Sequence, residues 1–115
     1  MARRSGDEAE RCPAVSTLQR MIGGKWKIEI LFYLGMKDIS RFGQLRRCIG
    51  NISESTLSKQ LRELADDGFI ERIDYGEIPP HVEYRLTERG RAFVPILEEM
   101  KAWAERELEY GNPPR

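Results

Sequence analysis

Two adjacent prolines, Pro79 and Pro80, stand just before a short segment, Val82–Leu86, in which apolar and charged residues alternate. Neither proline has a backbone N–H to donate, so the pair cannot lie inside a sheet. A second strand-like segment, Phe69–Tyr75, comes shortly before the prolines. We therefore predict a two-stranded hairpin, with the prolines in a stiffened tip where no ladder hydrogen bond is lost.

The rest of the chain has mainly helical periodicity. Ser53 and Thr87 are suited to begin helices as N-caps, and Gly35 is suited to end one as a C-cap. Pro95 lies inside the last helix, so we expect a kink there or a separate first turn. A short strand is expected at Lys37–Ser40. The expected helices begin near Pro13, cover Lys25–Leu34 and Phe42–Ile49, and follow Ser53 and Thr87.

This order of elements is that of a winged helix-turn-helix, in which the hairpin is the wing. The fold class is therefore mainly α with a small β-hairpin. The 115 residues are enough for one domain with its own core. We expect residues 1–11, which are polar and without period, to form a flexible arm, and residues 12–110 to form the domain that binds DNA and dimerises.

Charge is unevenly distributed, although the formal net charge is zero and the pI is about 6.6. Five basic residues and one acidic residue lie between Ser40 and Arg62, whereas the C-terminal segment from Glu98 to Glu109 is mainly acidic. Overall neutrality excludes a uniformly basic protein but permits a local basic face. No apolar run reaches the ~18 residues that span a bilayer, so we expect no membrane partner and a cytoplasmic location.

The helix after Ser53 has features of a DNA-recognition helix. Leu57, Leu61 and Leu64 fall on one face, and short hydroxyl and long hydrogen-bonding side chains occupy the other. Nearby arginines suit phosphate contacts, as do Lys25 and Lys27 beside Trp26. Alternatively, this is only a solvated helix face. The candidate DNA-binding residues are Arg41, Arg46, Arg47, Ser53, Ser55, Thr56, Lys59, Gln60, Arg62, His81 and Arg85.

The last helix has a longer apolar stripe than one small domain requires. Together with the first helix it would leave an exposed apolar patch, which a two-fold dimer would bury. The alternative is that this helix folds back onto the core of its own chain. The candidate interface residues are Val15, Leu18, Phe93, Leu97, Met100 and Trp103.

Cys12 lies before Pro13, at a helix start and beside Arg11. Both features favour a thiolate, so Cys12 is a candidate sensor of oxidants or electrophiles. The alternative is an unreactive residue at a dimer interface. We expect Cys48 at the margin of the core. The single histidine and two distant cysteines fit no catalytic or zinc pattern, so we expect no enzyme, no metal and no cofactor.

The sequence resembles the HxlR-type winged-helix transcriptional regulators, which are relatives of the MarR-like group. The resemblance covers roughly residues 12–104 and implies a homodimer that binds operator DNA through an interface of the first and last helices. In some members the cysteine that matches Cys12 senses electrophiles or oxidants. The family often has Arg or Lys where this chain has His81. The segments that carry the resemblance include GGKWK (23–27), FGQLRR (42–47), LSKQLREL (57–64), GFIER (68–72) and PPHVEYRLT (79–87).

Two functional hypotheses follow. The first is a homodimeric regulator that binds operator DNA and responds to thiol-reactive or oxidative signals. The second is a winged-helix module that binds other proteins and not DNA, which overall neutrality permits and the basic segment from Arg41 to Arg62 disfavours.

Overall fold

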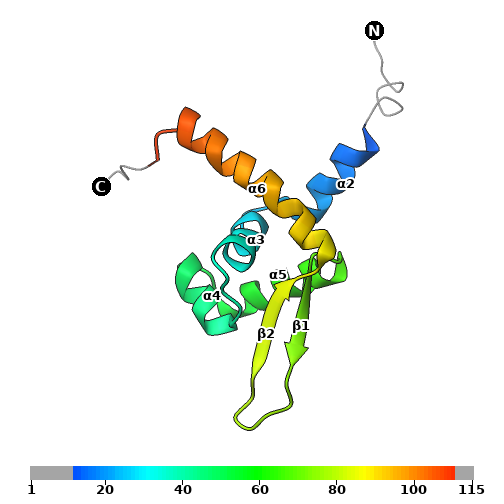
Figure 1. Cartoon of the computed structure of the whole chain (residues 1–115), viewed down its shortest axis with the longest axis vertical. Coiled ribbons are helices and arrows are strands. Elements are labelled where there is room, and N and C mark those ends of the chain that lie inside the picture. Colours follow the sequence, from blue (N-terminus) through cyan, green and yellow to red (C-terminus); the bar gives the residue numbers. More distant parts are fainter. Residues whose placement is uncertain (1–11, 111–115) are drawn as a thin grey trace.

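The computed structural model describes residues 12–110, so the predicted N-terminal arm, residues 1–11, lies outside the described residues. Within the described range, helices surround the base of a two-stranded antiparallel hairpin that projects from one end (Figure 1). This confirms the mainly α fold with a wing. The elements are α2 (Pro13–Ile22), α3 (Lys27–Met36), α4 (Phe42–Ile49), α5 (Glu54–Asp66), β1 (Ile70–Asp74), β2 (Val82–Leu86) and α6 (Glu88–Glu107).

The core lies where α3, α4, α5, the base of the hairpin and the first half of α6 meet. Helix α3 is central: Ile30, Leu31 and Leu34 are buried, and Tyr33 is half-buried against the same cluster. Ile28, by contrast, is exposed, so α3 is not buried on all sides. The most deeply buried side chains in the described chain are Ile30, Leu31, Leu45, Leu57, Leu61 and Leu64.

The hairpin has the predicted register and tip. Ile70 pairs with Leu86 at the base, and Asp74 pairs with Val82 at the far end. The prolines fall in the connecting tip. The strand expected at Lys37–Ser40 is not formed; one backbone hydrogen bond, from Tyr84 N to Ser40 O (2.8 Å), joins that segment to the wing.

Gly35 does not have the predicted role of a C-cap. It lies inside α3, which continues to Met36, and its backbone is in close contact with two other elements. A Cβ atom at this position would lie 2.8 Å from Leu86 Cδ1 and 3.0 Å from Val94 Cγ2. Glycine is therefore needed here because α3 approaches β2 and α6 closely, a contact between elements that local sequence does not reveal.

Helix α6 begins at the predicted cap and runs without a separate first turn. The Thr87 hydroxyl accepts a hydrogen bond from Gly90 N (3.1 Å) and donates one to Gly68 O (2.5 Å). Pro95 lies inside the continuous helix. Figure 1 shows the second half of α6 and helix α2 extending from the end of the molecule opposite the wing. Over residues 12–110, none of the helices is long and apolar enough to span a bilayer.

Candidate nucleic-acid interface

Helices α4 and α5 form the helix-turn-helix. Gly50 ends α4 with φ +98°, a left-handed backbone conformation that glycine adopts without strain. Ser53 then caps α5, as predicted: its Oγ accepts from Thr56 N (3.1 Å) and donates to Thr56 Oγ1 (2.9 Å). The hydroxyl groups of Ser53 and Thr56 therefore already contribute to the start of α5.

The two faces of α5 are those predicted. Leu57, Leu61 and Leu64 are buried against the core. On the opposite face Ser55, Lys59 and Arg62 are exposed, and Thr56 and Gln60 are half-buried at its margins. Within residues 12–110, neither Lys59 nor Arg62 forms an ion pair, so both positive charges are available to a ligand.

Arg46 is held inside the helix-turn-helix itself. Its Nε donates to Ile52 O (2.9 Å), and its guanidinium lies 3.6 Å from the Glu54 carboxylate. These contacts join the end of α4 to the turn and to the first residue of α5. The side chain of Arg46 is therefore less available for phosphate than the sequence suggested.

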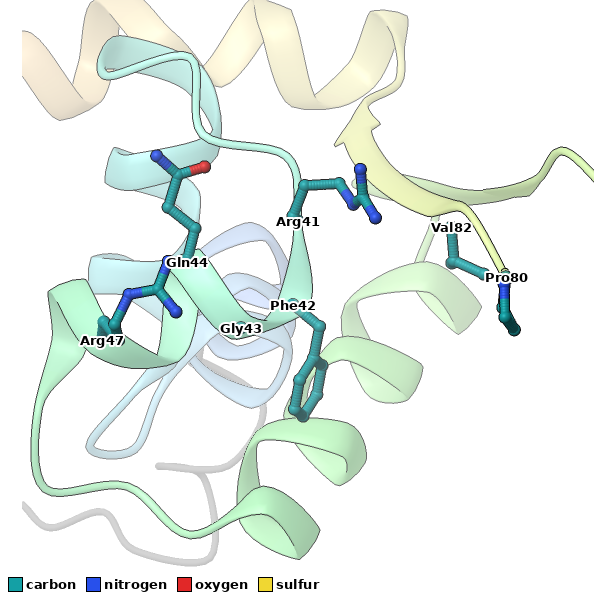
Figure 2. Close-up of a pocket in the computed structure, with 7 residues that line it drawn as sticks. All are labelled: Arg41, Phe42, Gly43, Gln44, Arg47, Pro80 and Val82. Atoms are coloured by element: carbon teal, nitrogen blue, oxygen red, sulfur yellow. The ribbon is translucent and has the colours of Figure 1, made fainter. Parts of the chain in front are cut away.

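Arg41 and Arg47, unlike Arg46, have side chains that are available for phosphate. They line a pocket of about 450 Å³ between the start of α4 and the wing. Figure 2 shows Arg41 extending toward β2, while Arg47 projects from α4. Neither arginine forms an ion pair with any residue from 12 to 110. Gln44, which sequence reasoning missed, lines the same pocket; its spacing of three residues from Arg47 on one helix was the available signal.

A second pocket, of about 360 Å³, separates α5 from the hairpin. Arg62 of α5 and Arg72 of β1 line it, together with the Tyr84 ring. Arg72 pairs with Tyr84 in the ladder, on the same face as the buried pair Ile70 and Leu86. Sequence reasoning missed Arg72, although the two-residue period of the strand places it on the face toward α5.

Two basic residues of the wing, Arg85 and His81, lie beside carboxylates of the same hairpin. Arg85 Nε lies 3.2 Å from Glu71 Oε2, a pair across the exposed face of the hairpin. His81 contacts two carboxylates, with Nε2 2.8 Å from Glu83 Oε2 and Nδ1 3.2 Å from Glu77 Oε1. The hydrogen bond with Glu83, followed by that with Glu77, raises the pKa of His81, whereas partial burial and the Arg41 charge oppose the rise.

The sequence predicts that Lys27 contacts phosphate at the surface, but its side chain does not reach the surface. Its side chain is only 9% exposed, and Nζ lies 2.7 Å from Glu63 Oε1 on α5. Lys25 is exposed, with its Nζ 4.8 Å from the centre of the Trp26 ring. The two lysines of the GGKWK segment therefore have different environments, and Lys27 serves the packing of α3 on α5.

The predicted interface residues fall into two groups. Val15 (63% exposed), Leu18, Met100 and Trp103 (52% exposed) lie on the outer surfaces of α2 and α6. Phe93 and Leu97, by contrast, are 7% and 4% exposed and belong to the core of their own chain. For these two residues the alternative of a helix folded back on its own domain is correct.

Both cysteines are exposed thiols. Cys12 is the N-cap residue of α2, and its carbonyl accepts from Ser16 N (3.0 Å). Cys48 lies on the exposed side of α4, so its predicted place at the core margin is wrong. Among residues 12–110 there is no cluster of three or more His, Cys, Asp or Glu side chains that could hold a metal ion.

A helix-turn-helix followed by a two-stranded wing defines the winged-helix class. Comparison with known proteins gives the family. The model of the HxlR-like helix-turn-helix family matches residues 21–112, and the chain belongs to this family. The relatives that the chain matches include several HTH-type transcriptional regulators. The HTH-type transcriptional regulator YybR of Bacillus subtilis strain 168 is 48% identical over 96 residues, which cover 84% of this chain and 75% of YybR.

Solved structures agree with this assignment. The redox regulator HypR in its oxidized form superposes with a TM-score of 0.76 at 40% identity, covering 85% of this chain and 99% of HypR. The reduced form of the transcriptional regulator YodB from B. subtilis superposes with a TM-score of 0.72 at 33% identity, covering 89% of this chain and 99% of YodB.

Proposed function

We propose that this transcriptional regulator acts as a homodimer that binds operator DNA with α5 in the major groove. The observation that carries the proposal is the exposed face of α5, where Lys59 and Arg62 project without any ion-pair partner in the described chain. An unpaired cation on such a face is suited to phosphate or to the acceptor edge of guanine. A DNA-bound regulator of this kind would act in the cytoplasm.

The residues around α5 support a division of roles. Ser55 and Lys59 lie toward the N-terminal half of α5, the part of a recognition helix that meets base edges. Arg41 and Arg47 flank that helix from α4 and would bind phosphates, which position the protein but carry no sequence information. Thr56, Gln60 and Arg62 complete the surface proposed to face DNA.

The proposed dimer uses the exposed residues of α2 and α6 and not the buried ones. Val15, Leu18, Met100 and Trp103 are all exposed and apolar, on helices that extend from the end opposite the wing (Figure 1). A two-fold dimer through this surface would leave both α5 helices free for two half-sites about one helical turn apart.

The test uses DNA fragments that are selected from a random library for binding to the protein. The double variant Lys59→Ala and Arg62→Ala is expected to weaken binding and to reduce the salt slope of log K by about two, since each phosphate contact contributes roughly one. Arg106→Ala, which removes one positive charge at the far end of α6, is the control and should bind as the wild type does. Unchanged affinity and salt dependence in the double variant would show that α5 is not the DNA reader. Absence of any DNA affinity at low salt would instead favour a protein-interaction module.

We further propose that Cys12 makes DNA binding responsive to oxidants. The support is its exposed thiol at the start of α2, next to the proposed dimer surface, and the likeness to a redox regulator solved in oxidized and reduced forms. Diamide removes two electrons and two protons from a pair of thiols and joins them as a disulfide. We expect diamide to change DNA affinity in the wild type and not in Cys12→Ser.

Cys48→Ser is the companion variant, because Cys48 is the other exposed thiol in the chain. Non-reducing gels of each variant after diamide treatment identify which thiols are joined and whether the bond lies between two chains. A Cys12→Ser protein that still lost DNA binding on treatment would exclude Cys12 as the sensor.

A further inference from the structure

The tip of the wing holds a small cluster of charged groups around His81. One ring nitrogen lies 2.8 Å from Glu83 Oε2 on β2, and the other lies 3.2 Å from Glu77 Oε1 in the tip. The Tyr75 ring, just after the outgoing strand, lies against the His81 ring with 4.4 Å between centroids and a tilt of 31°, and its hydroxyl donates to Glu83 Oε1 (3.4 Å). The histidine therefore touches both arms of the hairpin and the loop between them.

The hydrogen-bond chemistry of this cluster requires a proton. An ionised carboxylate only accepts hydrogen bonds, and a neutral imidazole has a single N–H to donate. Both contacts of His81 can be satisfied together only when both ring nitrogens carry hydrogen, that is, when the ring is an imidazolium. Two acidic neighbours that also raise the pKa of His81 stabilise that form, and the pKa of Glu83 is lowered in return, first by its hydrogen bond to His81.

We propose that the wing tip is a proton-operated clasp, in which the His81 imidazolium ties Glu77 in the tip to Glu83 on β2 and loss of its proton opens the tip. The charged and titratable groups that face His81 are Glu77, Glu83, the Tyr75 hydroxyl and, from the segment before α4, Arg41. Opening releases Glu77 and removes the positive charge that offsets the two carboxylates.

The effect on DNA rests on the proposed function. A wing near phosphates is repelled by uncompensated carboxylates, and the repulsion is least while His81 is protonated. Because the pKa of His81 is raised in the folded chain, the clasp is complete at low pH and is lost as the pH rises through that raised value. DNA affinity should accordingly fall as the pH rises. In this arrangement His81 acts on DNA through the charge and order of the wing, since both ring nitrogens are occupied within the chain.

The first experiment needs no DNA. His81 is the only histidine in the sequence, so its ring signals in an NMR titration are unambiguous. We expect a pKa above about 6.5, the usual value for histidine, and a fall toward that value in Glu83→Gln. Glu98→Gln, an exposed carboxylate on α6, is the control and should leave the titration unchanged. A wild-type pKa at or below the usual value, or one that Glu83→Gln does not alter, would overturn the clasp.

The second experiment measures DNA affinity from pH 6 to pH 8.5 for the wild type, His81→Gln and Glu77→Gln. Wild-type affinity should fall severalfold, with its midpoint at the pKa from the NMR titration, and the fall should be absent in His81→Gln and reduced in Glu77→Gln. If Glu77→Gln bound more tightly at every pH with an unchanged profile, His81 would contact phosphate directly and the clasp would be wrong. If no protein bound DNA at any pH, the proposed function would fail, and the titration of the free protein would still decide the clasp.

Discussion

Lys27 Nζ lies 2.7 Å from Glu63 Oε1, and this ion pair joins the first turn of α3 to the C-terminal half of α5. Lys27 is nearly buried, whereas the Glu63 side chain is 39% exposed. A buried ammonium is stable only when it is paired, so Glu63 compensates a charge that lies under α5. The contact therefore couples the stability of the core to the position of α5.

Replacing Glu63 with Gln is expected to destabilise the fold at neutral pH, because Lys27 would lose its charged partner. The hydrogen bond with Lys27 lowers the pKa of Glu63. A carboxyl group with a depressed pKa in the folded chain contributes stability that is present above its unfolded pKa and is lost as the pH falls through the folded value. The difference in unfolding free energy between wild type and Glu63→Gln should thus be largest at pH 7 and shrink below about pH 4.

Urea unfolding followed by circular dichroism at several pH values measures this difference. Glu99→Gln, which removes an exposed carboxylate on α6 that has no ion-pair partner in residues 12–110, is the matched control. A gap between wild type and Glu63→Gln that stayed constant across the pH range would mean that the ion pair contributes no charge-dependent stability.

Gly35→Ala is expected to destabilise the protein even though alanine is the better helix former. The added Cβ would lie 2.8 Å from Leu86 Cδ1 and 3.0 Å from Val94 Cγ2, so these packed side chains must shift. Overpacking of this kind costs ~1–3 kcal/mol, which outweighs the gain in helix propensity of about 1 kcal/mol. Chemical denaturation gives the value directly. A stabilised Gly35→Ala protein would mean that these side chains relax without cost.

Ser53→Ala removes the N-cap of α5, and the expected loss in unfolding free energy is about 1 kcal/mol. The reason is that Thr56 N would lose its hydrogen-bond acceptor at the start of the helix. Ser58→Ala, farther along α5, is the control, since its exposed hydroxyl lies away from the cap. Equal stability of the two variants would indicate that water replaces the Ser53 cap fully.

Trp103→Glu is expected to convert the proposed dimer to a monomer, because it places a charge in the centre of the exposed apolar surface on α6. Sedimentation or light scattering measures the mass. Ile78→Glu is the control: Ile78 is 98% exposed at the wing tip, at the other end of the molecule, and the variant should keep the wild-type mass. A monomeric wild type, or a dimer that Trp103→Glu leaves intact, would rule out this interface.

Local chemistry in the sequence determined the helices, the hairpin and their order, although the short strand expected at Lys37–Ser40 is not formed. The period of Leu57, Leu61 and Leu64 defined α5, the hydroxyls of Ser53 and Thr87 defined two helix starts, and the prolines placed the turn of the wing. These features act over a few residues, through spacing, capping and the missing N–H of proline, so they can be read without a fold.

Tertiary structure decided which charged residues are paired and which apolar residues are buried. Lys27 looked like a surface cation and is paired in the core, while Phe93 and Leu97 looked like interface residues and belong to the core. His81 looked like a phosphate ligand and lies between two carboxylates. The first two outcomes depend on a residue that is distant along the chain or on the burial that packing creates, and the third depends on the turn of the hairpin, which brings Glu77 and Glu83 to the two ring nitrogens. Sequence spacing fixes the face of an element on which a side chain lies, but only the packing of elements fixes what that face meets.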